Sequence, residues 1–94
     1  MSRCDYLYSI IGSNIRKLRI SLDKTQSIFA EEVGISESFV KQLEKKNEPK
    51  GVSLDTLVKI ADTYNVELTY FFDGYNWFIY SKTLSKLPLE HNTL

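Results

Sequence analysis

The chain has 94 residues, 43% of them hydrophobic and 26% charged, and its twelve basic residues balance its twelve acidic ones. This length and composition fit one soluble globular domain. A single cysteine, Cys4, excludes an internal disulfide, and no apolar stretch approaches the roughly 18 residues of a membrane span or resembles a signal peptide. We therefore expect a cytoplasmic protein with no membrane partner.

Residues 6–22 carry apolar side chains at every third or fourth position, which is the spacing of an amphipathic helix. These side chains are Leu7, Ile10, Ile11, Ile15, Leu18 and Leu22. Ser13 suits a helix start after Gly12, so residues 6–11 are either an extra turn of helix or an ordered arm. Residues 1–12 are accordingly an N-terminal extension of the first helix, or an arm.

Two short helices joined by a tight turn at Gly34 are predicted next. Thr25 is a favourable N-cap for residues 26–33, and a glycine just past a helix end readily takes the left-handed conformation. Ser36 caps the second helix of the pair, which we expect to span residues 36–46. Two helices meeting at such a turn form a helix-turn-helix, which docks its second helix in the DNA major groove.

A fourth helix is predicted over residues 54–64, with Ser53 as its N-cap and Asn65 at its end. Five of its side chains are expected to face inward: Leu54, Leu57, Val58, Ile60 and Ala61. Thr69 suits the cap of a short fifth helix that ends at Phe72. The chain up to this point is therefore expected to be all-α.

Residues 75–87 alternate rather than repeating at helical spacing, which predicts a strand or an extended arm. Its most apolar part holds Tyr75, Trp77, Phe78, Ile79 and Tyr80. Such a segment is too apolar to remain a free tail. It is expected to form a dimer seam, to pack on the first and fifth helices of its own chain, or to bind an effector or partner protein.

The helix over residues 36–46 has distinct core and free faces when residues are placed about 100° apart. Phe39, Val40 and Leu43 share the core face. The free face gathers Glu37, Ser38, Lys41, Gln42 and Lys45. Such a face is either merely solvated, as most polar helix faces are, or it is a binding surface.

A set of residues spread from about residue 11 to residue 73 supports the second reading through its order and spacing. The set is Ile15, Arg16, Lys17, Leu18, Arg19, Thr25, Gln26, Phe29, Ala30, Val33, Gly34, Ile35, Ser36, Val40, Leu43, Glu44, Pro49, Leu54, Leu57, Ile60, Ala61 and Val66. This segment resembles the Xre/Cro/phage-repressor family. The resemblance implies a five-helix repressor-like DNA-binding domain over residues 13–73, with residues 74–94 as a C-terminal aromatic strand or arm that is a candidate for dimerisation.

The resemblance also implies roles for single residues. Glu37, Ser38, Lys41 and Gln42 occupy positions that read base edges, and Gln26, Ser36, Lys45, Lys46, Asn47 and Lys50 occupy positions near phosphates. These residue types suit the chemistry, because glutamine pairs with adenine, lysine donates to guanine and glutamate accepts from cytosine. Gln26 would also brace the recognition helix. Each assignment competes with an ordinary structural or solvated role.

The family pattern further pairs Arg19 with Glu44, a structural ion pair that would tie the recognition helix to the scaffold. Lys46 stands where the family usually has a glycine, so the helix is expected to run on past Glu44 and to alter the following loop. Phosphate contacts assigned to that loop depend on its path.

The neutral net charge is unevenly divided. Residues 1–50 carry nine Lys and Arg against seven acids, a charge of +2, and residues 51–94 carry three against five, a charge of −2. Such a shallow basic footprint binds nonspecific DNA weakly. The family resemblance implies a transcriptional regulator, a repressor, that binds double-stranded DNA, and the weak basic charge leads us to expect specific binding as a homodimer. The alternative is a protein-interaction module, an antirepressor or partner subunit, that keeps the scaffold without strong DNA binding.

An enzyme is not expected. The chain has one histidine, His91, one cysteine, and no clustered carboxylate pair, glycine-rich phosphate loop or metal-ligand spacing. We expect no catalytic residues, no metal and no cofactor, and the sequence identifies no effector.

Overall fold

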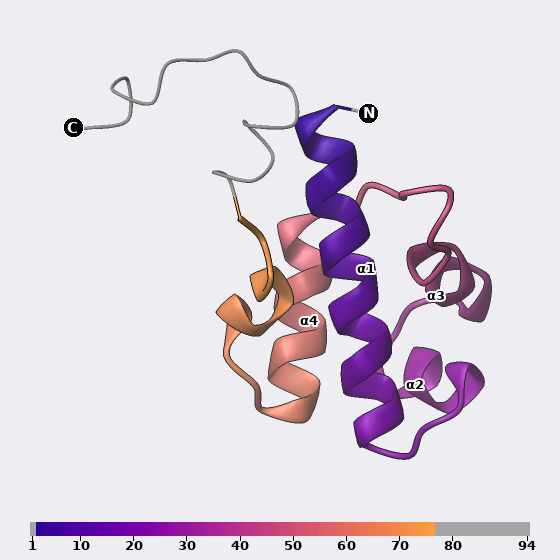
Figure 1. Cartoon of the computed structure of the whole chain (residues 1–94). Helices are drawn as coiled ribbons and strands as arrows, with labels where there is room; N and C mark the ends of the chain where they lie inside the picture. Colours follow the sequence, from indigo (N-terminus) through magenta and orange to yellow (C-terminus); the bar gives the residue numbers. More distant parts are fainter. Residues whose placement is uncertain (1, 77–94) are drawn as a thin grey trace, which may run out of the picture.

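Four α-helices and one short 3-10 helix follow one another through residues 2–76, the part of the chain that this computed structural model describes (Figure 1). They are α1 (Arg3–Ser21), α2 (Gln26–Val33), α3 (Glu37–Leu43), α4 (Leu54–Tyr64) and η1 (Leu68–Phe72). No strand occurs among these residues, so the all-helical class is confirmed for them. The predicted strand or arm lies almost entirely beyond Asn76, outside the described residues. None of the helices within residues 2–76 has the length and apolarity needed to cross a membrane.

The N-terminal extension is helical. Ser2 caps α1 by accepting a hydrogen bond from the backbone N–H of Asp5 at 3.0 Å, and the helix then runs without a break for 19 residues. Residues 6–11 therefore form extra turns of helix rather than an arm.

The predicted bounds of α2 and α4 are confirmed. Thr25 and Ser53 accept hydrogen bonds from the third backbone N–H beyond them, which starts each helix. Gly34 ends α2 with a φ of 89°, and Asn65 ends α4 with a φ of 55°. Both residues adopt the left-handed conformation that terminates helices. Capping residues thus identified both ends of both helices.

Helix α3 is shorter than predicted, and the expected run to Lys46 is wrong. It ends at Leu43, and Glu44 is its C-cap. Two contacts account for the stop: the Leu43 carbonyl faces Gly12 of α1, and the Glu44 side chain turns inward to Arg19. The predicted fifth helix is present only as the 3-10 helix η1.

A wrong capping residue was predicted for η1. The position before its first residue is Glu67, which makes no side-chain capping hydrogen bond, and Thr69 lies inside the helix. A polar residue near a helix start is therefore not enough to place that start when the helix is a single 3-10 turn.

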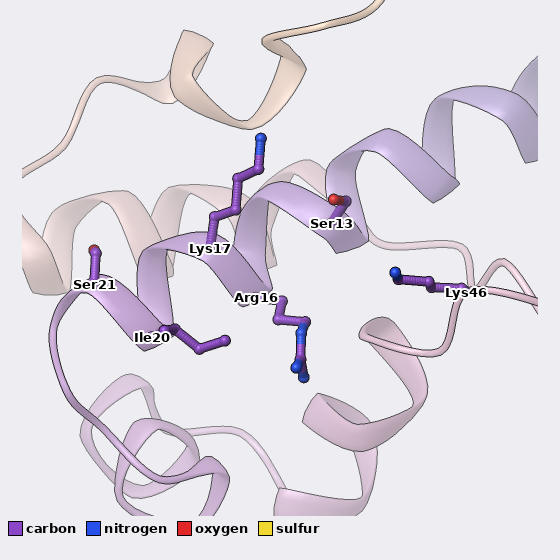
Figure 2. A pocket seen from close by; sticks show the side chains of 6 residues that line it. All are labelled: Ser13, Arg16, Lys17, Ile20, Ser21 and Lys46. Carbon is purple, nitrogen blue, oxygen red and sulfur yellow. The ribbon is translucent and has the colours of Figure 1, made fainter.

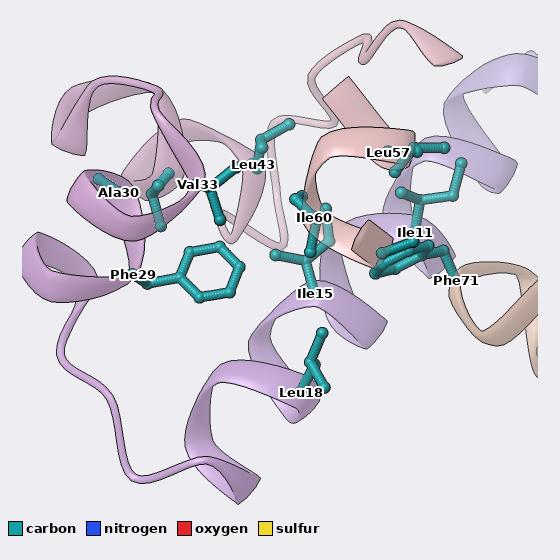
Figure 3. Packing of buried hydrophobic residues seen from close by; sticks show 12 residues of the cluster. Ile11, Ile15, Leu18, Phe29, Ala30, Val33, Leu43, Leu57, Ile60 and Phe71 are labelled. Carbon is teal, nitrogen blue, oxygen red and sulfur yellow. The ribbon is translucent and has the colours of Figure 1, made fainter. Parts of the chain in front are cut away.

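The core lies between α1 and the other helices (Figure 3). Its fully buried side chains come from every helix: Ile15, Phe29, Val40, Leu57, Ile60 and Phe71. Leu57, Ile60 and Ala61 face inward as predicted, but Leu54 is 66% exposed and Val58 is 42% exposed. The inward placement expected for those two residues is wrong, because only one narrow stripe of α4 meets the core.

A buried asparagine joins the start and the end of this domain. Asn14 in α1 is 3% exposed, and its side-chain N–H groups donate to the carbonyls of Phe71 and Asp73, each at 2.9 Å. Beyond η1, the hydroxyl of Tyr75 accepts from the Arg3 guanidinium at 2.8 Å, and its ring lies 5.6 Å from that of Tyr6. The chain after η1 therefore returns along the first turns of its own α1.

Candidate nucleic-acid interface

The free face of α3 holds the four predicted base-reading residues, Glu37, Ser38, Lys41 and Gln42, and all four are exposed. Behind them, Val40 and Leu43 are 0% and 4% exposed and fix the rotation of the helix. Ser36 sets its start, because its side-chain oxygen accepts from the N–H of Phe39 at 3.0 Å. The core of the domain thus presents one polar face of α3 to the outside.

Two of these residues neutralise each other. The Lys41 ammonium lies 3.4 Å from the Glu37 carboxylate, one turn away on the same face, and the two side chains are 58% and 46% exposed. Exposed pairs of this kind add little stability, about 0.3–0.5 kcal/mol. The pair matters instead because it lowers the net positive charge on the free face of α3.

The chain that follows α3 carries most of the predicted phosphate contacts. Lys45, Lys46, Asn47 and Lys50 are all exposed there. Lys45 lies 3.3 Å from the Glu48 carboxylate, a second pair open to solvent. Between the end of α3 and this loop lies a concavity of about 260 Å³, lined by Gln42, Lys45, Glu48, Pro49 and Lys50. The predicted base-reading and phosphate residues therefore border one another at the end of α3.

A buried carboxylate holds this surface on the scaffold. The Glu44 side chain is 3% exposed, and Arg19 donates to its two oxygens at 2.7 and 2.9 Å. Arg19 also donates to the carbonyl of Lys24, and the hydrogen bonds with Glu44 raise the pKa of the arginine further. This bidentate geometry is the strong form of an arginine–carboxylate contact. Helix α1 is thereby tied to the end of α3 and to the start of α2.

Gln26 joins the same cluster. Its side-chain N–H donates to Glu44 at 3.1 Å, and the residue is half-buried at the first position of α2. The structure therefore places Gln26 as a brace between α2 and α3.

No structural role was predicted from the sequence for Gly12 and Arg16, which contact the end of α3, or for Asn14, which holds η1 against α1. Arg16 lies 3.6 Å from Glu44 and is half exposed. The signal for Arg16 was its place one turn before Arg19 on the same helix face. For Asn14 the signal was an amide within the apolar stripe of a helix, where a buried polar group needs partners.

A separate contact locks α2 to α4. The Tyr64 hydroxyl donates to Glu32 at 2.7 Å, Lys24 lies 3.1 Å from the same carboxylate, and the Tyr64 ring stacks on Phe29 at 5.3 Å. These hydrogen bonds lower the pKa of Glu32. Burial, followed by the bond to Glu32, raises the pKa of the Tyr64 phenol far above its usual range. Both shifts favour the hydrogen-bonded form.

Within residues 2–76 no group of three or more His, Cys, Asp or Glu side chains is arranged to hold a metal ion. Cys4 is exposed near the start of α1.

This arrangement of α2, a left-handed glycine and an outward-facing α3 defines a helix-turn-helix domain. The helix-turn-helix family profile matches residues 15–71, which is more than half of the chain, and the chain belongs to that family. It is also similar to a protein of Cereibacter sphaeroides called a propionyl-CoA carboxylase regulator, with 34% identity over 58 residues. That match covers 62% of this chain but only 12% of the relative. No solved structure matches the chain.

Proposed function

We propose that this protein is a cytoplasmic, sequence-specific DNA-binding regulator of transcription, a repressor that places α3 in the major groove as a homodimer. The observation that carries the proposal is the exposed polar face of α3, held by the buried Glu44 cluster. Membership of the helix-turn-helix family and the regulator name of the relative support it. That family binds DNA and is not an enzyme family.

In the proposed complex, base edges are read by Glu37, Ser38, Lys41 and Gln42, and phosphates are held by Gln26, Ser36, Lys45, Lys46, Asn47 and Lys50. Gln42 pairs with adenine, Lys41 donates to guanine, and Glu37 accepts from cytosine. Binding must open or reorient the Glu37–Lys41 pair. We propose that Glu37 acts chiefly through repulsion, because DNA sequences that leave its carboxylate beside a phosphate bind less tightly.

We propose a homodimer because the net charge of the chain is zero. A neutral protein gains little affinity from its overall field, so two recognition helices about 34 Å apart supply what one cannot. We propose that residues 74–94 form the seam. Tyr75 lies against its own α1, which leaves Trp77, Phe78, Ile79 and Tyr80, all beyond the described residues, as the candidates for contact with the second subunit.

The alternative function, a protein-interaction module, is favoured by one observation. Leu54 and Val58 are exposed one turn apart on α4, and apolar side chains on a helix face are typical of partner surfaces. A module of this kind would bind through α4 and would not depend on the free face of α3.

Selection of bound duplexes from a random pool tests both functions. A dimeric repressor enriches a sequence with two-fold symmetry, and Gln42→Ala relaxes the preference at one base pair of each half-site. Ser27→Ala, on the exposed surface of α2, is the matched control and leaves the preference unchanged. If no duplex is retained above random DNA at low salt, the DNA-binding proposal fails. Sedimentation equilibrium of the full chain tests the dimer, and repression of a reporter by the selected site tests the direction of regulation.

A further inference from the structure

A second concavity lies on α1, beside Lys46 in the loop that follows α3, and it is rich in basic residues. Its volume is about 380 Å³, and it is lined by Ser13, Arg16, Lys17, Ile20, Ser21 and Lys46. Three of these six residues are cations and none is an acid. Figure 2 shows that Arg16, Ile20 and Lys46 border the same space, whereas Lys17 extends from α1 in another direction. We call this the α1 groove.

The Arg16 guanidinium has unused binding capacity. Its only carboxylate neighbour within the described residues is Glu44 at 3.6 Å, and that carboxylate already accepts two hydrogen bonds from Arg19 and one from Gln26. Arg16 is also half exposed, whereas Glu44 is buried. Glu44 therefore positions the Arg16 side chain without neutralising it, since its charge is shared with the closer Arg19.

Lys46 supplies the facing charge. It is exposed, it has no salt bridge among residues 2–76, and it lies three residues beyond the end of α3. The Ser13 hydroxyl adds a neutral donor at the same groove, and the half-exposed Ile20 adds an apolar surface. Guanidinium, ammonium and hydroxyl donors around one space match the oxygens of a phosphate group. The apolar surface of Ile20 matches the carbons of an attached sugar.

We infer that the α1 groove binds a phosphate group, and that in the DNA complex this is a backbone phosphate flanking the site read by α3, held by Arg16 and Lys46. The DNA part of this inference rests on the proposed function. The groove borders the end of α3, where the backbone of a duplex carrying α3 in its major groove continues past the domain. A free phosphate ion shares this chemistry, so the test separates the two sources.

The first experiment measures affinity for the selected duplex by fluorescence anisotropy at roughly 50 to 300 mM salt. Counterion release changes the affinity measurably over this range. Arg16→Gln and Lys46→Gln should each weaken binding several-fold. Each should also reduce the slope of log affinity against log salt by about 0.9 per protomer, the loss of one phosphate contact. Lys59→Gln, which removes an equal charge from the exposed surface of α4, should leave the slope unchanged.

Lys46→Gln guards against misfolding as an explanation, because Lys46 makes no ion pair among the described residues and its loss should not change the melting temperature. If wild-type protein binds the duplex and both groove variants keep its salt slope, the groove does not bind a DNA phosphate and that part of the inference is overturned. If wild-type protein binds no duplex, the proposed function fails instead.

The second arm then decides the groove itself. Inorganic phosphate is titrated into the full-length protein while backbone amide shifts are followed by NMR. Saturable shifts confined to Ser13, Ile20 and Lys46, and absent in Arg16→Gln, establish a phosphate site that does not depend on DNA. Shifts that are absent or spread evenly over the exposed lysines overturn the inference.

Discussion

Gly12 of α1 lies directly against the carbonyl oxygen of Leu43, the last residue of α3. A side chain at position 12 would collide with that backbone atom, and backbone cannot rotate aside as a flexible side chain can. The close approach of these two helices therefore depends on the missing Cβ, and it holds the end of the recognition helix at a fixed distance from α1.

Gly12→Ala tests this packing against helix propensity. In an open helix the change would stabilise by up to about 1 kcal/mol. Here we expect the opposite, a loss of about 1–3 kcal/mol in the free energy of unfolding, because overpacking outweighs propensity. Urea denaturation measures the change, with exposed Ser13→Ala as the neighbouring control. A more stable Gly12→Ala would show that the two helices can separate without cost.

Glu44→Gln tests the buried carboxylate. Removing its charge strands Arg19 among buried partners, so we expect a loss of about 3–5 kcal/mol in the free energy of unfolding. Glu48→Gln removes a carboxylate that is 74% exposed and paired with Lys45, and it should change stability by less than about 0.5 kcal/mol. Thermal and urea unfolding of both variants measure the difference. Equal effects would mean that the Glu44 cluster does not brace the domain.

Asn14→Asp tests the clamp on η1. The carboxylate keeps the shape of the amide but cannot donate to the carbonyls of Phe71 and Asp73, and it repels them. We expect the variant to lose more than Asn14→Ala, for which unsatisfied buried groups cost about 1–3 kcal/mol. Hydrogen exchange should show the loss first at η1. Protection lost uniformly over the domain would mean that η1 does not open separately.

Tyr64→Phe tests the contact between α2 and α4 through its pH dependence. Folding raises the pKa of the phenol from its ordinary value of 10.0, so the stability it contributes is present below about pH 10 and is lost as pH rises further. Wild-type protein should therefore lose more stability than Tyr64→Phe between neutral pH and pH above about 10. Urea titrations at each pH measure this difference, and parallel curves for the two proteins would contradict it.

Glu32→Gln probes the acid side of the same contact. Folding lowers the pKa of Glu32 from its ordinary value of 4.5, chiefly through the Tyr64 hydrogen bond and then through Lys24. Its contribution is therefore present above about pH 4.5 and is lost as pH falls through the lowered pKa. The stability difference between wild-type protein and Glu32→Gln should vanish in acid. A difference that persists there would rule out the charged carboxylate as its source.

Glu37→Gln probes the charge on α3. Loss of the carboxylate removes repulsion of phosphate and releases Lys41, so affinity for random duplex DNA should rise several-fold while preference for the selected site falls. Asp62→Asn makes the same charge change on the exposed surface of α4 and should have a much smaller effect. Anisotropy titrations with selected and random duplexes measure both quantities. Unchanged binding to random DNA would place Glu37 away from the backbone.

The parts of the fold that local chemistry determines were predictable from the sequence. Thr25, Ser36 and Ser53 cap helices because their side chains satisfy nearby backbone N–H groups, and Gly34 turns the chain because it lacks a Cβ. These interactions span three or four residues. The free face of α3 was predictable for the same reason, because the helical repeat of about 3.6 residues determines which side chains share a face.

Apart from the capping residue of η1, the predictions that failed depend on contacts between distant residues. The end of α3 depends on Gly12 and Arg19, more than twenty residues earlier, and periodicity within one helix carries no information about them. Leu54 and Val58 fit the apolar pattern of α4, but the width of the buried stripe is set by how closely its neighbours pack. Arg16 gained significance only when the structure placed it across a groove from Lys46.

The bond between Arg3 and Tyr75 joins residues 72 positions apart. It implies an order of events during synthesis of the chain on the ribosome. Ile11 and Phe71 belong to one buried cluster, which is complete only once Phe71 has emerged from the exit tunnel, and the bond to Arg3 forms only after Tyr75 has followed. The apolar stripe of this first helix can therefore be fully buried only after residues up to Tyr75 have left the tunnel, and until then it is open to chaperones.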